Sequence, residues 1–126
     1  MDAYDAEQPL DSIAWLELDE ETQIDLVVRY HRRHHPATPR VRLHATFHTI
    51  VENQVASNES VVVKTLARLQ SEGLSRHDAV HAIGSVLAAQ VYDLLKREGP
   101  GEGKDPNEAY AAQLLQLTAE SWRNSG

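Results

Sequence analysis

The spacing of helix-breaking residues is the feature that most constrains the fold of this chain. Pro36 and Pro39, the stretch 57–60 (SNES), Gly73 and the stretch 98–105 divide it into segments of helix length. Within these segments apolar residues recur at spacings of three and four, and no segment shows the sustained alternation that is typical of a half-buried strand. The pattern therefore predicts an all-α chain.

Helix-capping signals predict where these segments begin and end. Asp19 can cap the first long helix, Gly73 suits the position after the third, and Asp105 with Pro106 suits the start of the last. The expected helices cover about 12–18, 20–34, 40–56, 59–72, 75–97 and 106–122. Helices joined by short loops usually pack against their sequence neighbours in opposite directions, which predicts an antiparallel helical bundle of four to five helices.

The length of 126 residues suits one compact domain. Residues 1–9 are acidic and are expected to form a flexible tail. Residues 10–126 are expected to form a single helical-bundle domain. Within it, the stretch 98–105 is rich in glycine and proline and predicts a linker before the last helix.

Charge and composition narrow the classes of function. The chain has 12 basic and 19 acidic residues, a formal net charge of −7, which disfavours binding to anionic nucleic acid. No stretch approaches the roughly 20 apolar residues that cross a membrane, and the acidic start does not resemble a signal peptide. The absence of cysteine excludes disulfides, thiol nucleophiles and iron–sulfur clusters. We expect a cytoplasmic protein that binds neither nucleic acid nor membranes.

Six of the seven histidines form pairs spaced by four residues. The pairs are His31/His35, His44/His48 and His77/His81. Side chains spaced in this way on a helix lie about 40° apart around its axis and about 6 Å apart along it, so two imidazoles can bind one metal ion. The helices over 40–56 and 75–97 are expected to run parallel, which would place two of the pairs at the same end of the bundle.

This placement predicts a metal site. The expected ligands are His44, His48, Glu52, His77 and His81. Burial of imidazoles without partners is unfavourable, and a divalent ion would satisfy them. Nitrogen and carboxylate ligands suit zinc, iron, manganese or nickel, with zinc or iron as the first choices.

Other polar residues are candidates of second rank for this site. They are Gln54, Glu59 and Glu72. His31, His34 and His35 lie near the end of the first long helix, where histidines can simply interact with the negative end of the helix dipole. Whether these three join the site is left open by the sequence.

Two short motifs resemble known metal sites. HDAVH at 77–81 is similar to the zinc-protease motif H-E-x-x-H, with aspartate in place of glutamate. HTIVE at 48–52, followed by HDAVH, resembles the middle helices of hemerythrin-type dinuclear iron bundles. That resemblance implies histidine and carboxylate ligands, with a further ligand from His31 or His34. The last helix of this chain lacks the histidine of that pattern, and His44 is an addition to it.

A longer resemblance covers most of residues 13–123. The stretches VENQ at 51–54 and EGLSRHDAVHAIG at 72–84 resemble a family of short bacterial proteins labelled only as a domain of unknown function. The resemblance implies an all-helical domain and brings no activity with it.

A second hypothesis needs no metal. The last helix follows the expected linker, so it could dock on a second subunit and form a twofold homodimer with an interaction or regulatory role. The sequence leaves open whether the protein is an enzyme.

Overall fold

A computed structural model of the chain describes residues 1–96 and 105–125, which form α-helices and no strands. The all-α prediction is confirmed. In chain order the helices are α1 (Ser12–Leu16), α2 (Glu20–His34), α3 (Val41–Ala56), α4 (Ser60–Ser71), α5 (Arg76–Lys96), α6 (Pro106–Gln116) and α7 (Ala119–Asn124). Most of the expected linker, residues 98–104, lies outside the described residues.

Three of the caps expected from the sequence are present at helix ends. The carboxylates of Asp19 and Asp105 accept hydrogen bonds from backbone N–H groups in the first turns of α2 and α6. Gly73 ends α4 with a φ of +105°, a backbone conformation that favours glycine. The last expected helix is divided in two, because Thr118 and Ser121 form a capping box that starts α7.

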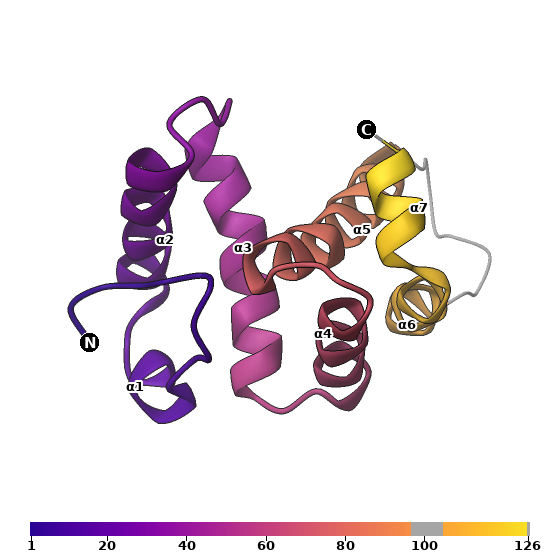
Figure 1. Cartoon of the computed structure of the whole chain (residues 1–126), viewed down its shortest axis with the longest axis horizontal. Helices are drawn as coiled ribbons and strands as arrows, with labels where there is room; N and C mark the ends of the chain where they lie inside the picture. The colour runs from indigo at the N-terminus through magenta and orange to yellow at the C-terminus, as the bar shows by residue number, and fades with distance from the viewer. Residues whose placement is uncertain (97–104, 126) are drawn as a thin grey trace.

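Helix α3 is the central element of the fold. Figure 1 shows α1 and α2 on one side of α3, and α4 to α7 on the other. Each side has its own apolar core. Buried Trp15 and Val27 belong to the core shared with α1 and α2, whereas Val51, Leu69 and Ile83 belong to the core shared with α4 to α7. Buried Tyr110 and Leu114 pack α6 onto this second core, whereas Leu115 on the same helix is exposed.

The acidic segment 1–9, expected from the sequence to form a flexible tail, has two buried residues. Tyr4 and Ala6 are 5% and 0% exposed, and the Tyr4 ring lies 5.5 Å from that of Trp15. Burial of a tyrosine stabilises this segment, because its apolar ring leaves water and its hydroxyl has a partner in Glu52. The acidic composition suggested a solvated segment and gave no indication that Tyr4 and Ala6 are buried.

A buried ion pair joins α3 to the first residue of α5. The two terminal guanidinium nitrogens of Arg76 each donate to a carboxylate oxygen of Glu52 at 2.8 Å, and Arg76 also donates to the backbone oxygen of Ala6. The side chains of Arg76 and Glu52 are 6% and 0% exposed. The Tyr4 hydroxyl donates to the same carboxylate. The network therefore fixes the start of α5 and the N-terminal segment against α3.

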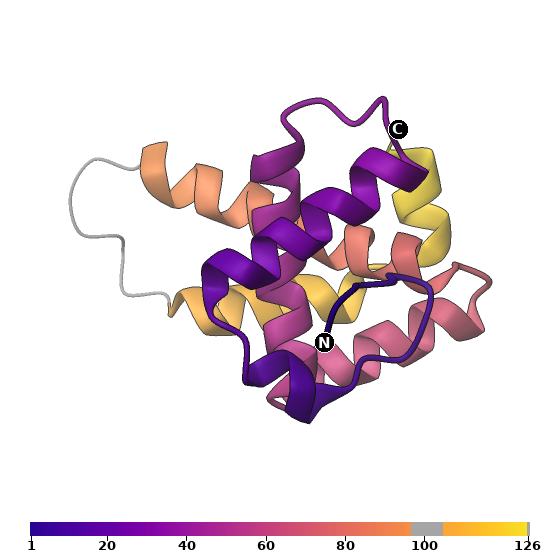
Figure 2. The same cartoon turned by 90° about the vertical axis from the view of Figure 1, so that its left-hand side faces the viewer.

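Helices α3 and α5 cross, in contrast to the parallel arrangement expected from the sequence. Figures 1 and 2 show α5 running across α3 rather than alongside it. The start of α5 is held at Glu52, one turn after His48, and Gly84 lies near Phe47 and Val51 further along the contact. Of the helices that the structure describes, none is both long and apolar enough to cross a membrane.

Loss of one partner from the buried pair should be strongly destabilising, because it leaves a buried charge without compensation. We expect Arg76→Met to lower the free energy of unfolding of the metal-free protein by about 3–5 kcal/mol. Arg42→Met is the matched control, since Arg42 pairs with Glu21 and Asp25 while half exposed, and it should cost about 1 kcal/mol or less. Urea unfolding measures both, and equal losses would contradict a structural role for the buried pair.

Candidate metal centre

Six histidines meet where α2, α3 and α5 approach one another, and together they are called the histidine cluster below. Two come from the end of α2 and its cap, two from α3 and two from α5. They are His31, His35, His44, His48, His77 and His81. The contacting rings have centroids 4.2 to 6.1 Å apart. His34 lies outside the cluster, with its ring 4.7 Å from that of Tyr30.

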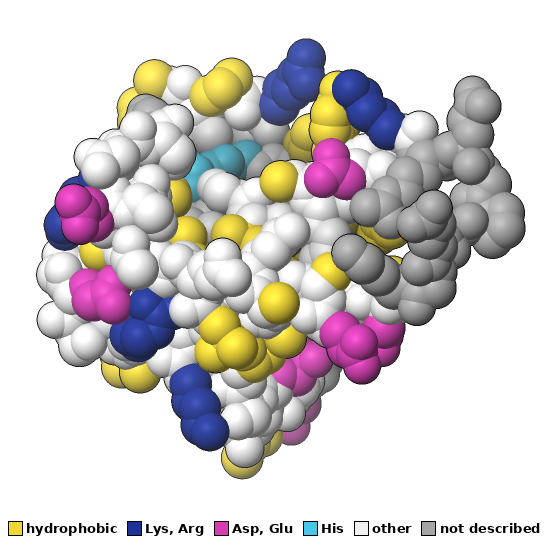
Figure 3. Space-filling view, turned by 90° about the vertical axis from the view of Figure 1, so that its right-hand side faces the viewer, with side chains coloured by type: hydrophobic (Ala, Val, Ile, Leu, Met, Phe, Trp, Pro, Cys, Tyr) yellow, Lys and Arg dark blue, Asp and Glu magenta, His cyan; other side chains and the backbone are white. Residues whose placement is uncertain are grey.

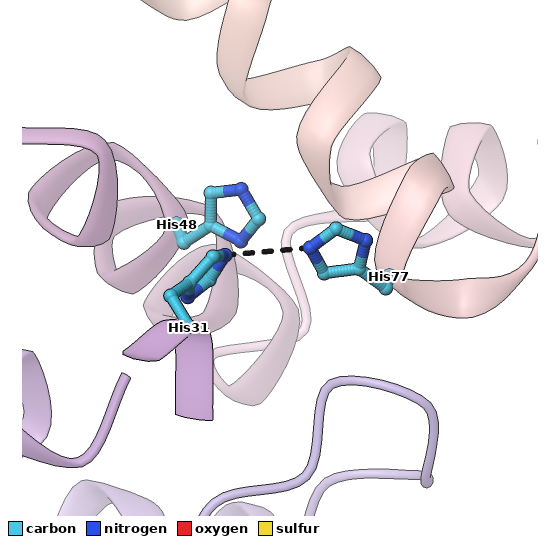
Figure 4. A group of neighbouring side chains, drawn as sticks. All are labelled: His31, His48 and His77. Atoms are coloured by element: carbon cyan, nitrogen blue, oxygen red, sulfur yellow. Dashed lines mark hydrogen bonds between the residues drawn. The ribbon is translucent and has the colours of Figure 1, made fainter. Parts of the chain in front are cut away.

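Three fully buried members form the inner group: His31, His48 and His77. They are 0%, 2% and 6% exposed, and each offers a ring nitrogen within 4.8 Å of those of the other two. Figure 4 shows the three rings turned toward one another, with Nε2 of His31 facing Nε2 of His77 at 3.3 Å. Each ligand comes from a different helix, so an ion held here would join α2, α3 and α5.

Hydrogen bonds at the far side of two rings define where their protons lie. Nδ1 of His31 is 2.9 Å from the backbone oxygen of Val27, and Nδ1 of His77 is 3.2 Å from Oδ1 of Asp78. A carbonyl and a carboxylate only accept hydrogen bonds, so both Nδ1 atoms carry the proton in the neutral rings. The two Nε2 atoms therefore face each other with lone pairs. Two lone pairs at this distance repel one another unless a proton or a metal ion lies between them.

The outer group shares one residue with the inner group. It consists of His44, His48 and His81, whose ligand atoms also lie within 4.8 Å of one another. These side chains line a cavity of about 80 Å³ together with Phe47, Gly84, Ser85 and Ala88. Figure 3 shows histidine at the bottom of a hollow on the face that carries α7. The outer group is therefore reached from solvent, whereas the inner group is enclosed.

Three buried nitrogens of the outer group have no hydrogen-bond partner among the described residues: Nε2 of His44 and both ring nitrogens of His48. Buried polar atoms are nearly always paired, because an unpaired one loses its bond to water without replacement. These three buried nitrogens therefore need a hydrogen-bond partner or a metal ion.

Burial favours the uncharged form of several of these histidines at neutral pH. It lowers the pKa of His31 and of His44 to about 4, with further contributions from neighbouring histidines. Burial and the rings around it hold the pKa of His48 far below its usual range, and the pKa of His81 is lowered for the same reasons. Neutral imidazoles have free lone pairs, which is the form that binds metal ions.

The structure places the expected carboxylate ligand elsewhere. Glu52 lies one turn beyond His48, but both of its oxygens bind Arg76 and one also accepts from Tyr4. Glu72 accepts from Arg68 and from the backbone of Ala119. The four expected histidines, by contrast, are brought together in the cluster.

Two other second-rank residues also lie apart from both groups of ligand atoms. Gln54 accepts a hydrogen bond from the Tyr110 hydroxyl, and Glu59 is the exposed residue before α4.

His31 is the site residue that sequence reasoning did not select. It was interpreted as a residue at the end of a helix, yet it is fully buried at the centre of the cluster. A signal was present, because Ile24, Val27 and His31 recur at spacings of three and four on the buried face of α2. A histidine that continues an apolar stripe points inward.

A scan against protein-family models finds no match to this chain, and searches of curated proteins and of solved structures find none either. Function is therefore inferred from the geometry of the cluster.

The lowered pKa values predict that the metal-free protein loses stability in mild acid. Well above pH 6.5, the ordinary pKa of histidine, His31 and His44 are neutral in both the folded and the unfolded states, so they add no pH dependence there. As the pH falls toward 4, the unfolded chain takes up protons that His31 and His44 resist in the folded protein, and the free energy of unfolding falls. Thermal melting with chelator present should show a clear decrease between pH 7 and pH 5. An unchanged melting temperature would contradict the burial of neutral histidines.

Proposed function

We propose that this protein binds a transition-metal ion through the imidazoles of the inner group, His31, His48 and His77. The observation that carries the proposal is the approach of two lone-pair nitrogens to 3.3 Å, with both opposite nitrogens held by acceptors. A metal ion between them would convert a repulsive contact into two bonds. It would also give a partner to a buried nitrogen of His48.

The ligand set favours zinc among the ions considered. Zinc–nitrogen bonds of about 2.0–2.1 Å in a tetrahedral site place two ligand nitrogens about 3.3–3.4 Å apart, which agrees with the spacing of His31 and His77. Manganese prefers oxygen ligands. A hemerythrin-type iron site would need a carboxylate, and the nearest one, Glu52, is bound to Arg76. The all-histidine inner group is therefore proposed in place of the set with Glu52.

Groups around the ligands support the same proposal. A metal-binding histidine usually donates its other ring nitrogen to a carbonyl or a carboxylate, which fixes the orientation of the ring. Val27 and Asp78 accept in this way from His31 and His77. His35 stacks on His77, with centroids 4.2 Å apart and ring planes 13° apart. The ligands would thus be held in place before the ion arrives.

The inner group suits an ion that stabilises the fold. Its three ligands are buried and join three helices, so an ion that binds only the folded chain adds its binding free energy to stability. An enclosed ion is poorly placed to react with a substrate. We therefore assign the inner ion a structural role.

Metal analysis tests the proposal directly. Protein purified without a histidine tag and reconstituted with zinc should retain at least about one equivalent after gel filtration, and should melt at a higher temperature than the chelated protein. His31→Ala and His77→Ala should weaken binding at the inner group and lose most of that thermal gain. His34→Ala is the matched control, because His34 is exposed on the same helix and outside both groups. Retention of less than about one-tenth of an equivalent by the unchanged protein would overturn the proposal.

The orienting carboxylate gives a separate prediction. Asp78→Asn removes the negative charge that holds Nδ1 of His77, and should weaken zinc binding by about 10- to 100-fold. Asp93→Asn, on the exposed surface of the same helix, should leave it unchanged. Competition with a chromophoric chelator measures both affinities. Equal affinities for the two variants would show that Asp78 does not act on the site.

A further inference from the structure

His48 belongs to both the inner and the outer group, and its two ring nitrogens face different ways. Figure 4 shows one nitrogen turned toward His31 and the other turned away from it. Both are buried and lack a hydrogen-bond partner among the described residues. A metal ion in the inner group would bind only one of them. The other would still carry an N–H group with no acceptor, which is an unfavourable state for a buried donor.

The rings of the outer group lie beside this second nitrogen's ring. The His44 ring lies 4.4 Å from that of His48 and 4.8 Å from that of His81. Nε2 of His44 is also buried and unpartnered within the described part of the chain. The three residues offer ligand atoms within 4.8 Å of one another, the same limit as in the inner group. Two independent orphaned side chains therefore point to one further cation.

We propose that His48 bridges two metal ions, one in the inner group and one held by His44, His48 and His81. This inference rests on the proposed metal binding of the inner group. The second ion replaces the proton on the free nitrogen of His48, and that proton leaves to solvent. The bridge is then an imidazolate, whose negative charge is shared by two divalent cations. With bonds of about 2 Å on either side of one ring, the ions lie about 6 Å apart.

The two ions would differ in access. The cavity beside the outer group has a volume of about 80 Å³, enough for about two or three water molecules at about 30 Å³ each. An outer ion with three histidine ligands would keep its fourth position for water or a small anion. Three protein ligands and one open position are the arrangement of catalytic zinc, which lowers the pKa of bound water. Both groups offer three histidines, but only the outer group lines the cavity. The outer ion is therefore the one placed to react.

Stoichiometry tests the second site. The unchanged, untagged protein should bind two zinc equivalents by elemental analysis after reconstitution. His44→Gln and His81→Gln should each retain about one, whereas His34→Gln should retain two. Two variants are used because either could disturb folding, and circular dichroism checks the helix content of each. One equivalent in the unchanged protein, unaffected by His81→Gln, would overturn the second site and leave the inner one intact. No bound zinc would overturn the proposed function itself.

Copper(II) tests the bridge. Two copper ions joined by one imidazolate couple their unpaired electrons, so the electron paramagnetic resonance signal should rise with the first equivalent and fall by at least about half with the second. His81→Gln should keep the signal of one isolated ion. A signal that doubles in the unchanged protein would show two unbridged ions and would overturn the role of His48.

Discussion

The ion pair between Glu52 and Arg76 is the interaction on which the arrangement of the site depends. Glu52 lies one turn after His48 on α3, and Arg76 immediately precedes His77 on α5. A bidentate contact between a carboxylate and a guanidinium permits little freedom in distance or angle. The pair therefore determines which part of α3 the start of α5 crosses, and so brings His77 beside His48. Because both side chains are buried, slippage of one helix along the other would separate two charges away from water.

The histidine cluster has a physical consequence for the domain. Five of the six imidazoles are buried or half-buried where a helical protein would ordinarily have apolar side chains, and burial lowers the pKa of several of them. Without a bound ion, three of the buried ring nitrogens have no hydrogen-bond partner among the described residues, which is unfavourable for the contact between these helices. Binding of an ion would turn the same region into a cross-link between α2, α3 and α5. Stability and metal occupancy are thus expected to be coupled.

Much of the fold followed from local signals. Asp19, Gly73 and Asp105 act through their own hydrogen bonds or backbone conformation, so the ends of α2, α4 and α6 could be predicted. The histidine pairs could be predicted as well, because residues four apart on a helix share a face whatever surrounds it. The division between α6 and α7 was missed, since apolar residues continue across Thr118 and only the capping box ends the helix.

The sequence alone could not predict which side chains, distant along the chain, form ion pairs or hydrogen bonds. Glu52 continues the row of His44 and His48 on one helix face, which suggested a metal ligand. Instead, Glu52 forms an ion pair with Arg76, which lies 24 residues further along the chain. Tyr4, 48 residues before Glu52 in the sequence, donates a hydrogen bond to the same carboxylate. The acidic composition around Tyr4 had predicted a flexible tail. The sequence by itself determined the helices and which histidines lie on one face, because those depend on local geometry. Only the tertiary structure decided that α5 crosses α3, that His31 joins the histidine cluster and that Glu52 pairs with Arg76, because those depend on which buried charges and apolar faces meet.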